Sequence, residues 1–355
     1  MLKILQRWAA RSLARAPDAW LRLGSEATPP QRRGRTLDAR LALLARRAAE
    51  PPLHALTPAA ARDRVRAAAA ALAGPPRASI EREQRGIPGA AGVIPLRAYR
   101  PPHLDGPRPL LLYFHQGGFV VGDLDLCEAF CTLLAETARC VVASVGYRLA
   151  PEHRFPAAHD DAYAAFAWAR EHAGEIGGDA QRILVGGDGA GATLAAAICQ
   201  QAVRRGHSLP RLQLLVYPWL IACADGASYR DFGDAAPLTR EDVRWCLAHY
   251  LGSDAERDDP RAWPLLAPDL SALPPALIVA AGFDPLCDEA AEYASRLRGA
   301  GVPVAHRCCE ALCHGFSALG GAVPAARCAL EQIAWDLERV LTRDALPHAA
   351  RDPSA

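Results

Sequence analysis

The sequence has 355 residues, of which 51% are hydrophobic and 22% charged, close to the usual composition of globular proteins. A chain of this length can bury one large core, or one core and a lid. No apolar run reaches the roughly 18–20 residues that a membrane-spanning helix needs. The 11 cysteines include no Cys-x-x-Cys pair, and a leader with a long apolar stretch is missing, so we expect a reduced, cytoplasmic setting.

The net charge of +1 conceals a strong asymmetry along the chain. Residues 1–100 carry 19 Lys and Arg against 7 Asp and Glu, whereas the remaining residues carry 21 against 32. Residues 1–24 have the periodicity of a basic amphipathic helix, with Lys3, Arg7, Arg11 and Arg15 four residues apart on one face. Two explanations stay open for this segment. It is a solvated, Arg-rich part of a lid, or it makes peripheral contact with anionic lipid or an acidic partner.

Further helices are predicted after the first segment. A basic loop follows from Thr28 to Arg35, and two helical stretches are predicted at about 36–49 and 57–73, the second ended by Gly74-Pro75-Pro76. At the other end of the chain, residues 344–355 are predicted to be a frayed tail.

After about residue 80, short apolar runs alternate with helical stretches. The runs are Leu110–Phe114, Val141–Val145, Ile183–Val185, Leu212–Val216 and Ala276–Ala280. This alternation predicts an α/β fold whose mostly parallel sheet is covered by helices on both faces. Neither an internal repeat nor a G-x-G-x-x-G nucleotide loop occurs, and we expect no nucleic-acid partner and no cofactor.

The first of three candidate motifs is His115-Gln116-Gly117-Gly118-Phe119, directly after a predicted strand. Functional groups in this kind of sheet lie just beyond the carboxyl ends of the strands. Because glycine has no Cβ, the N–H groups of Gly117 and Gly118 can approach a ligand oxygen closely. Such donors stabilise the oxyanion of acyl transfer. A tight turn that simply needs glycine is the alternative interpretation.

The second motif is Gly187-Asp188-Gly189-Ala190-Gly191, between a predicted strand and a helix rich in small residues. It has the frame of a nucleophile elbow, G-x-S-x-G, with glycine at the central position. The N–H of Ala190 would lie at a helix N-terminus and complete an oxyanion hole. A phosphate site is the weaker alternative, since no Gly-Lys-Ser/Thr follows.

The third motif is the pair Asp284 and His314. Asp284 follows the strand predicted at Ala276–Ala280, and His314 lies in Cys313-His314-Gly315-Phe316. Elbow, then acid, then histidine is the chain order of a triad on an α/β-hydrolase sheet. A structural role is the usual one for a lone loop histidine, but His314 has a carboxylate ahead of it in the expected order.

These motifs and two further segments carry a family resemblance. The six segments are His115–Phe119, Tyr147–Glu152, Gly187–Gly191, Tyr217-Pro218, Asp284–Glu289 and His314–Phe316. From about residue 88 to 341 the chain resembles the bacterial hormone-sensitive-lipase-like carboxylesterases, which have the α/β-hydrolase fold.

The resemblance implies a division of the chain and a role for each motif. Residues 1–85 would form the basic helical segment and cap, and residues 86–343 the hydrolase domain, with a cap contribution near 219–250. Asp284 and His314 would be the acid and base of the triad. The oxyanion donors would be Gly117, Gly118 and Ala190.

The sequence departs from this family at four positions. The family expects serine at 189, glycine at 116, commonly aspartate at 146 and glycine at 192, where this chain has Gly189, Gln116, Gly146 and Ala192. Without a hydroxyl at 189, His314 has nothing to deprotonate and no acyl-enzyme can form. An engineered knockout and natural divergence both explain Gly189, and we favour divergence because a knockout would not require Gln116 or Gly146.

We therefore expect a carboxylesterase scaffold for small hydrophobic acyl or aryl esters, impaired at its nucleophile position Gly189. A pseudoenzyme that binds a small molecule, and non-hydrolytic chemistry with His314 and Asp284 as base, stay open as alternatives. Asp188 and Cys313 are the candidates for a substitute nucleophile that are adjacent to the motifs. The cluster of Cys308, Cys309 and Cys313 matches no zinc spacing, so we expect no metal. The sequence sets no oligomeric state.

Overall fold

The computed structural model describes residues 29–46, 51–102, 106–234, 237–343 and 346. Its centre is an eight-stranded sheet in the order β10-β9-β8-β7-β5-β6-β4-β3, in which β4 alone runs opposite to the other strands. The strands are β3 Glu81–Gly89, β4 Gly92–Arg100, β5 Arg108–Phe114, β6 Val141–Val145, β7 Gly178–Asp188, β8 Gln213–Val216, β9 Ala276–Phe283 and β10 Val304–Cys313.

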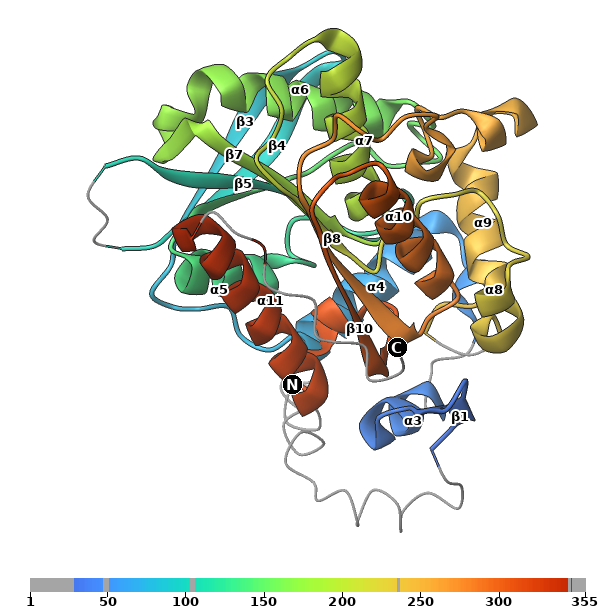
Figure 1. Ribbon diagram of the computed structural model, residues 1–355. Helices are drawn as coiled ribbons and strands as arrows, with labels where there is room; N and C mark the ends of the chain where they lie inside the picture. The colour runs from blue at the N-terminus through green and yellow to red at the C-terminus, as the bar shows by residue number, and fades with distance from the viewer. Residues whose placement is uncertain (1–28, 47–50, 103–105, 235–236, 344–345, 347–355) are drawn as a thin grey trace.

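Helices cover both faces of this sheet (Figure 1). Leu110, Leu112 and Phe114 of β5 pack in one buried cluster with residues of α6, α7 and α10. Leu111 and Tyr113 point to the opposite face and pack with α5 and α11. Each face is apolar because both are buried, as in a doubly covered parallel sheet. The helices are α3 Ala39–Arg46, α4 Pro58–Leu72, α5 Glu128–Ala138, α6 Ala157–His172, α7 Ala190–Arg205, α8 Ala227–Phe232, α9 Arg240–Tyr250, α10 Cys287–Gly299 and α11 Pro324–Arg343.

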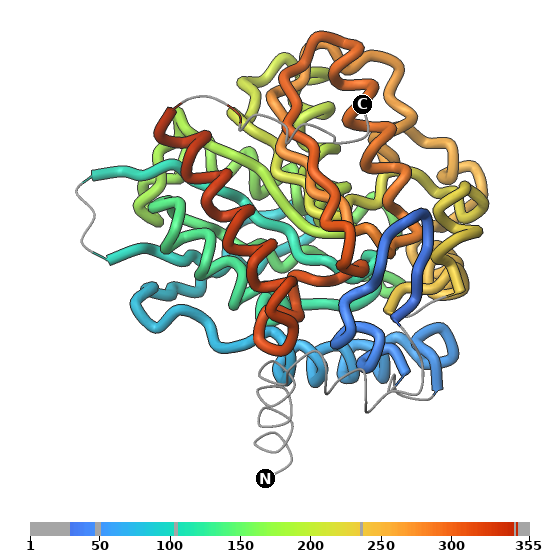
Figure 2. The backbone as a smooth tube through the Cα atoms, turned by 60° about the horizontal axis from the view of Figure 1, so that its bottom comes forward, coloured from blue at the N-terminus to red at the C-terminus, as the bar shows by residue number. Residues whose placement is uncertain are grey.

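Three segments that are distant in sequence are tied together beside the sheet. They are α4, α9 and the short 3₁₀ helix η1 (Leu53–Ala55). The backbone N–H of His54 donates to Asp242 Oδ1 of α9 at 3.0 Å, and Arg62 of α4 donates to the carbonyl oxygens of Val120 and Ala150 at 2.8 Å each. In Figure 2, α4 runs along the lower edge of the molecule, beside the N-terminal hairpin.

The mostly parallel sheet predicted from the apolar runs is confirmed, and every predicted run lies in or directly beside a strand of the structure. The helix predicted at 57–73 is α4. The described part of the helix predicted at 36–49 is α3, which begins at Ala39, and residues 47–49 of that prediction lie outside the described residues. Three strands of the sheet, β3, β4 and β10, come in addition to the five predicted runs. Residues 1–85 were expected to form the basic helical segment and cap. The first strand of the sheet, β3, begins at Glu81 and therefore lies partly within them.

The prediction of a loop up to Arg35 is wrong for its described part. Gln31–Arg32 (β1) pairs with Arg35–Thr36 (β2) as a short antiparallel hairpin. Arg33 and Gly34 form its turn with φ of 51° and 73°, and the guanidinium of Arg33 contacts Asp231 and Asp288 at 2.6 Å each. These ion pairs hold the turn against the domain, which the local sequence does not show.

Residues 1–24 and all of the predicted tail except residue 346 lie outside the described residues. Among the helices that the structure does describe, none has the length and apolar character to cross a membrane.

Candidate active site

The loop after β5 is held in one shape by its glycines and by buried hydrogen bonds. A Cβ on Gly117 would lie 1.9 Å from the carbonyl oxygen of Val121, and one on Gly118 would lie 2.4 Å from Cys246 Sγ. Both glycines also have φ in the left-handed region, 134° and 59°. Tyr147 Oη donates to the carbonyl oxygen of His115 at 2.7 Å. The loop is therefore also a tight turn that needs glycine, because a Cβ would collide with neighbouring atoms.

The turn from β7 into α7 is the elbow that the second motif predicts. Gly189 has φ 54° and ψ −118° and directly precedes Ala190, the first residue of α7. A Cβ on Gly187 would lie 2.4 Å from the carbonyl carbon of Gly191, and one on Gly191 would lie 1.9 Å from the carbonyl oxygen of Phe114. The two outer glycines thus allow the helix to approach the sheet closely, as a sharp strand-to-helix turn requires.

Asp284 and His314 meet at the carboxyl ends of β9 and β10. His314 Nδ1 lies 2.8 Å from Asp284 Oδ2, and the backbone N–H of Leu286 donates to Asp284 Oδ1 at 2.9 Å. Asp284 is fully buried, whereas the His314 side chain keeps 14% of its surface exposed. Because the carboxylate accepts from Nδ1, the imidazole presents the lone pair of Nε2 on its other side.

Nε2 of His314 faces the central residue of the elbow. A Cβ on Gly189 would lie 3.4 Å from His314 Nε2 and 3.3 Å from Cβ of Gln116. The structure therefore brings together all three predicted motifs at one point. Gln116 is a neighbour of that point, and its Nε2 donates to Ser317 Oγ at 3.4 Å.

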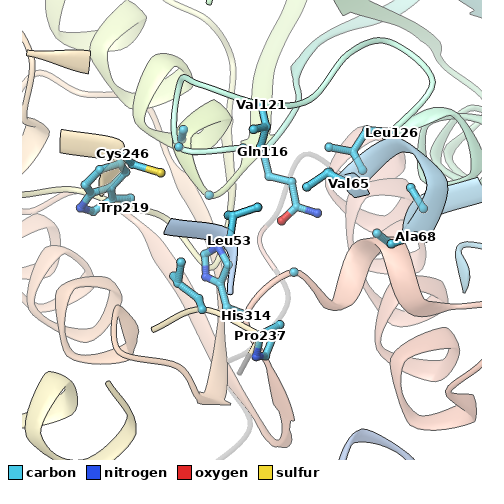
Figure 3. Close-up of a pocket in the computed structure, with 18 of the residues that line it drawn as sticks. Leu53, Val65, Ala68, Gln116, Val121, Leu126, Trp219, Pro237, Cys246 and His314 are labelled. Atoms are coloured by element: carbon cyan, nitrogen blue, oxygen red, sulfur yellow. The ribbon is translucent and has the colours of Figure 1, made fainter. Parts of the chain in front are cut away.

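A mostly apolar cavity of about 200 Å³ opens onto this point. Figure 3 shows Gln116 and His314 reaching into it, with Trp219 and Cys246 on one side and Val65 and Leu126 on the other. Five of the six predicted site residues line the cavity. The sixth, Asp284, does not line it but contacts His314, which does. Much of the remaining wall comes from η1, α4, α9 and the segments near them: Leu53, Val65, Ala68, Ala69, Leu72, Pro237, Leu238, Val243 and Cys246.

Asp188 and Cys313 do not line the cavity. Asp188 is buried beneath the elbow, where its Oδ2 accepts from Tyr217 Oη at 2.8 Å and from Ser317 Oγ at 2.6 Å. Burial raises the pKa of Asp188 above its ordinary value. Burial also raises the pKa of the Cys313 thiol to about 12, so it stays protonated near neutral pH. Neither residue is in position to replace a nucleophile at 189.

The Cys308, Cys309 and Cys313 thiols all lie on β10. Burial raises the pKa of each, to about 11 for Cys309. In the part of the chain that the structure describes, no three His, Cys, Asp or Glu side chains are grouped to hold a metal ion. His314, next to this cluster, is paired with Asp284 instead.

Comparison with known proteins agrees with this geometry. A family model described as alpha/beta hydrolase fold matches residues 111–318, which is more than half of the chain. The chain belongs to the α/β-hydrolase family. This confirms both the predicted fold class and the family resemblance found in the sequence motifs.

The relatives of this α/β-hydrolase are named as esterases. The chain is 47% identical over 263 residues to "Carboxylic ester hydrolase LipN" of Mycobacterium tuberculosis, which covers 72% of this chain and 69% of that protein. It is 40% identical over 235 residues to "Ethyl acetate hydrolase" of Pseudomonas putida, covering 65% and 74%. The chain is thus a carboxylesterase-type hydrolase by family.

Solved structures give the same family. A thermostable esterase from Pseudomonas putida superimposes with a TM-score of 0.80 at 33% identity, covering 84% of this chain and 94% of that one. An ester hydrolase from the Lake Arreo metagenome, in complex with a bipyridine phosphonate derivative, gives 0.78 at 37% identity, covering 83% and 94%.

The sequence motifs missed most of the cavity wall of this α/β-hydrolase. Cys246 lies on α9, far along the chain from the motifs, yet lies beside Gly118 of the loop after β5. Glu289 lies in Asp284–Glu289, one of the segments that carry the family resemblance, but the sequence assigned Glu289 no role. It is buried and accepts from the backbone N–H of Leu220 at 2.6 Å and of Ile221 at 3.2 Å. Its position two residues into α10 gave no signal of this contact.

Proposed function

We propose that this α/β-hydrolase keeps the acyl-ester site of the carboxylesterases but lacks its nucleophile, because glycine stands at position 189. Its ligand is a small hydrophobic acyl or aryl ester, which it hydrolyses at best marginally. One observation carries the proposal: a side chain at 189 would start 3.4 Å from His314 Nε2, where a serine hydroxyl could reach that nitrogen.

In this proposal every other part of an acyl-transfer site has an assigned residue. His314 is the base, and Asp284 holds its tautomer and orientation. The N–H groups of Gly117, Gly118 and Ala190 are the oxyanion donors. The cap is formed by η1, α4 and α9, whose apolar side chains line the cavity and support a hydrophobic acyl or aryl group.

The same cavity favours a second candidate, a binding protein without turnover. Its mostly apolar lining would hold a small molecule whether or not chemistry follows. A third candidate uses the unprotonated Nε2 of His314 to remove a proton from a bound carbonyl compound, without an acyl-enzyme.

The substitution Gly189→Ser tests the proposal. We expect hydrolysis of p-nitrophenyl butyrate to rise by at least about 10²-fold over the unsubstituted chain, because a nucleophile activated by an adjacent base is restored. His314→Ala in the Gly189→Ser background should remove the gain.

A folded Gly189→Ser protein without any gain would contradict the esterase site. In that case a thermal shift by phenyl butyl ketone, a small aryl ketone that cannot be hydrolysed, would favour the binding protein. Release of deuterium from the carbon beside the carbonyl of a labelled ketone would favour the third candidate.

A further inference from the structure

The space beside Gly189 is bounded by a base on one side and by a glutamine side chain on the other. The base is His314 Nε2, and the side chain is Gln116, whose Cβ would be 3.3 Å from a Cβ at 189. All three residues line the same cavity. In the proposed function, an ester in that cavity would place its carbonyl carbon near Gly189, within reach of a small molecule hydrogen-bonded to His314 Nε2.

His314 is prepared to act on whatever occupies that position. Its Nδ1 is held by the fully buried Asp284 at 2.8 Å, and the Asp284 carboxylate is itself fixed by the N–H of Leu286. This pairing favours the neutral tautomer with its proton on Nδ1 and the lone pair on Nε2, and it stabilises the imidazolium that forms when Nε2 accepts a proton. A base in this state can deprotonate a free molecule as well as a side-chain hydroxyl.

We propose that the space beside Gly189 binds a small external nucleophile, water or a small primary alcohol, which His314 activates for direct attack on the bound ester. This inference rests on the proposed function, since it needs an ester in the cavity. It adds an activity: acyl transfer from the ester to a free alcohol in one displacement, without an acyl-enzyme.

The step balances without any further reactant. His314 Nε2 takes the proton of the alcohol while its oxygen forms a bond to the carbonyl carbon. The N–H groups of Gly117, Gly118 and Ala190 hold the oxyanion of the tetrahedral intermediate. When the intermediate collapses, the original ester C–O bond breaks and His314 returns the proton to the leaving alkoxide. The products are a new ester and the original alcohol, or an acid when water is the nucleophile.

The size of the nucleophile is limited by Gln116. Its side chain runs from the position beside Gly189 to Gly315, where a Cβ would lie 3.3 Å from Gln116 Oε1. The amide is further held by Ser317, which is itself bonded to the buried Asp188. A side chain anchored in this way narrows the approach to His314 Nε2, so we expect methanol to be accepted and a branched alcohol to be excluded.

The experiment measures release of p-nitrophenolate from p-nitrophenyl butyrate by the full chain in increasing methanol. We expect the release rate to rise with methanol concentration, with methyl butyrate formed in an amount that accounts for the increase. The methanol-dependent rate should fall roughly 10²-fold in His314→Ala, because general-base catalysis is lost. It should also be absent with 2-methyl-2-propanol, which is too large for the space.

Gly189→Ala is the matched variant, since it fills the space with a methyl group and supplies no hydroxyl. We expect it to lose the methanol effect. A rise with methanol that is the same in Gly189→Ala or His314→Ala, or the same with the branched alcohol, would overturn the inference. If Gly189→Ala shows no cooperative melting transition and is therefore not folded, His314→Ala and the series of alcohols test the inference.

Gly189→Ser, measured in parallel, separates this inference from the proposed function. If the serine variant gains hydrolysis while the unsubstituted chain shows no response to methanol, the ester site stands and the external-nucleophile site is wrong. If neither occurs, the proposed function fails together with the inference.

Discussion

The three glycines of the elbow differ in why they are glycine. At Gly187 and Gly191 a Cβ would meet backbone atoms at 2.4 Å and 1.9 Å, which no side-chain movement can relieve. At Gly189 it would meet only side-chain atoms, at 3.3 Å and 3.4 Å, although φ is 54°. The outer glycines are therefore required by packing, whereas the central one could be another residue at a strain cost of about 1–3 kcal/mol.

Gln116 is expected to limit the activity that a serine at 189 can restore. Since its Cβ would be 3.3 Å from the serine Cβ, the two side chains compete for space beside His314. We predict that Gly189→Ser/Gln116→Gly hydrolyses p-nitrophenyl butyrate faster than Gly189→Ser alone. Gln116→Gly by itself is the control and should stay inactive. A double variant that is slower than Gly189→Ser would show that Gln116 assists the site.

Glu289 gives a residue-scale prediction about pH. Burial raises its pKa well above the ordinary value of 4.5. As pH rises above about 4.5, the acid ionises in the unfolded state but stays protonated in the folded state, where its pKa is raised. The free energy of unfolding therefore falls until the pH reaches the folded-state pKa. Gln keeps the acceptor for Leu220 and Ile221 but cannot ionise.

Between about pH 5 and pH 8, the free energy of unfolding should therefore fall less in Glu289→Gln than in the unsubstituted chain. We expect the two decreases to differ by at least about 1 kcal/mol. Urea unfolding of both proteins at the two pH values measures this difference. An equal loss in both would mean that Glu289 does not cause the pH dependence.

At the scale of elements, Arg62 joins α4 to the loop that follows β5. Arg62 donates to the carbonyl oxygens of Val120 and Ala150 at 2.8 Å and forms an ion pair with Glu152 at 2.6 Å. Val120 directly follows the loop that carries Gly117 and Gly118. The position of α4, and with it one wall of the cavity, depends on these contacts.

Arg62→Ala should destabilise the protein by about 1–3 kcal/mol, because two partly buried carbonyl groups lose their donor. It should also weaken the thermal shift produced by phenyl butyl ketone. Arg244→Ala is the matched control, since Arg244 is half-exposed on α9 and pairs with Glu241 one helical turn away. Equal effects of the two substitutions would contradict the role of Arg62 in placing α4.

The elements show what the sequence could and could not predict. Strands buried on both faces, such as β5 and β6, are continuous apolar runs and were predicted. β3 lies at the sheet edge and is largely exposed and charged, and β4 contains Pro95, a residue that argues against a strand, so neither was predicted. The motifs identify Asp284 and His314 from chain order, but the cavity wall joins η1, α4 and α9 by tertiary packing that no local pattern encodes.

At the scale of the whole molecule, described arginines of the basic N-terminal third contact acidic residues of the remainder. Arginines between residues 33 and 97 form ion pairs with acidic residues beyond position 120. These pairs are Arg33 with Asp231 and Asp288, Arg62 with Glu152, Arg66 with Asp123, Arg77 with Glu136, Arg82 with Glu128, Arg85 with Glu175 and Arg97 with Asp125. The charge asymmetry thus reflects internal pairing for this part of the chain.

Removal of residues 1–34 should leave the protein folded with a slightly lower melting temperature. The structural reason is Arg33, whose exposed ion pairs contribute at most about 1 kcal/mol. Arg33→Ala in the full chain should give the same decrease, measured by thermal melting. An unfolded truncated protein would show that the segment belongs to the core.

Contact of residues 1–24 with membranes stays a prediction, and the same pair of proteins tests it. The full chain and Arg33→Ala should both sediment with anionic lipid vesicles, and the truncated protein should not. Sedimentation of all three would assign the contact to another surface.

The central claim is that this carboxylesterase site lacks only a nucleophile at 189. Intact-protein mass spectrometry after reaction with diethyl p-nitrophenyl phosphate, which labels an activated serine, tests it most directly. The account predicts no adduct on the unsubstituted chain and one diethylphosphoryl group on Gly189→Ser, mapped to position 189 and absent when His314→Ala is added. A stoichiometric adduct on the unsubstituted chain, or none on a folded Gly189→Ser protein, would contradict it.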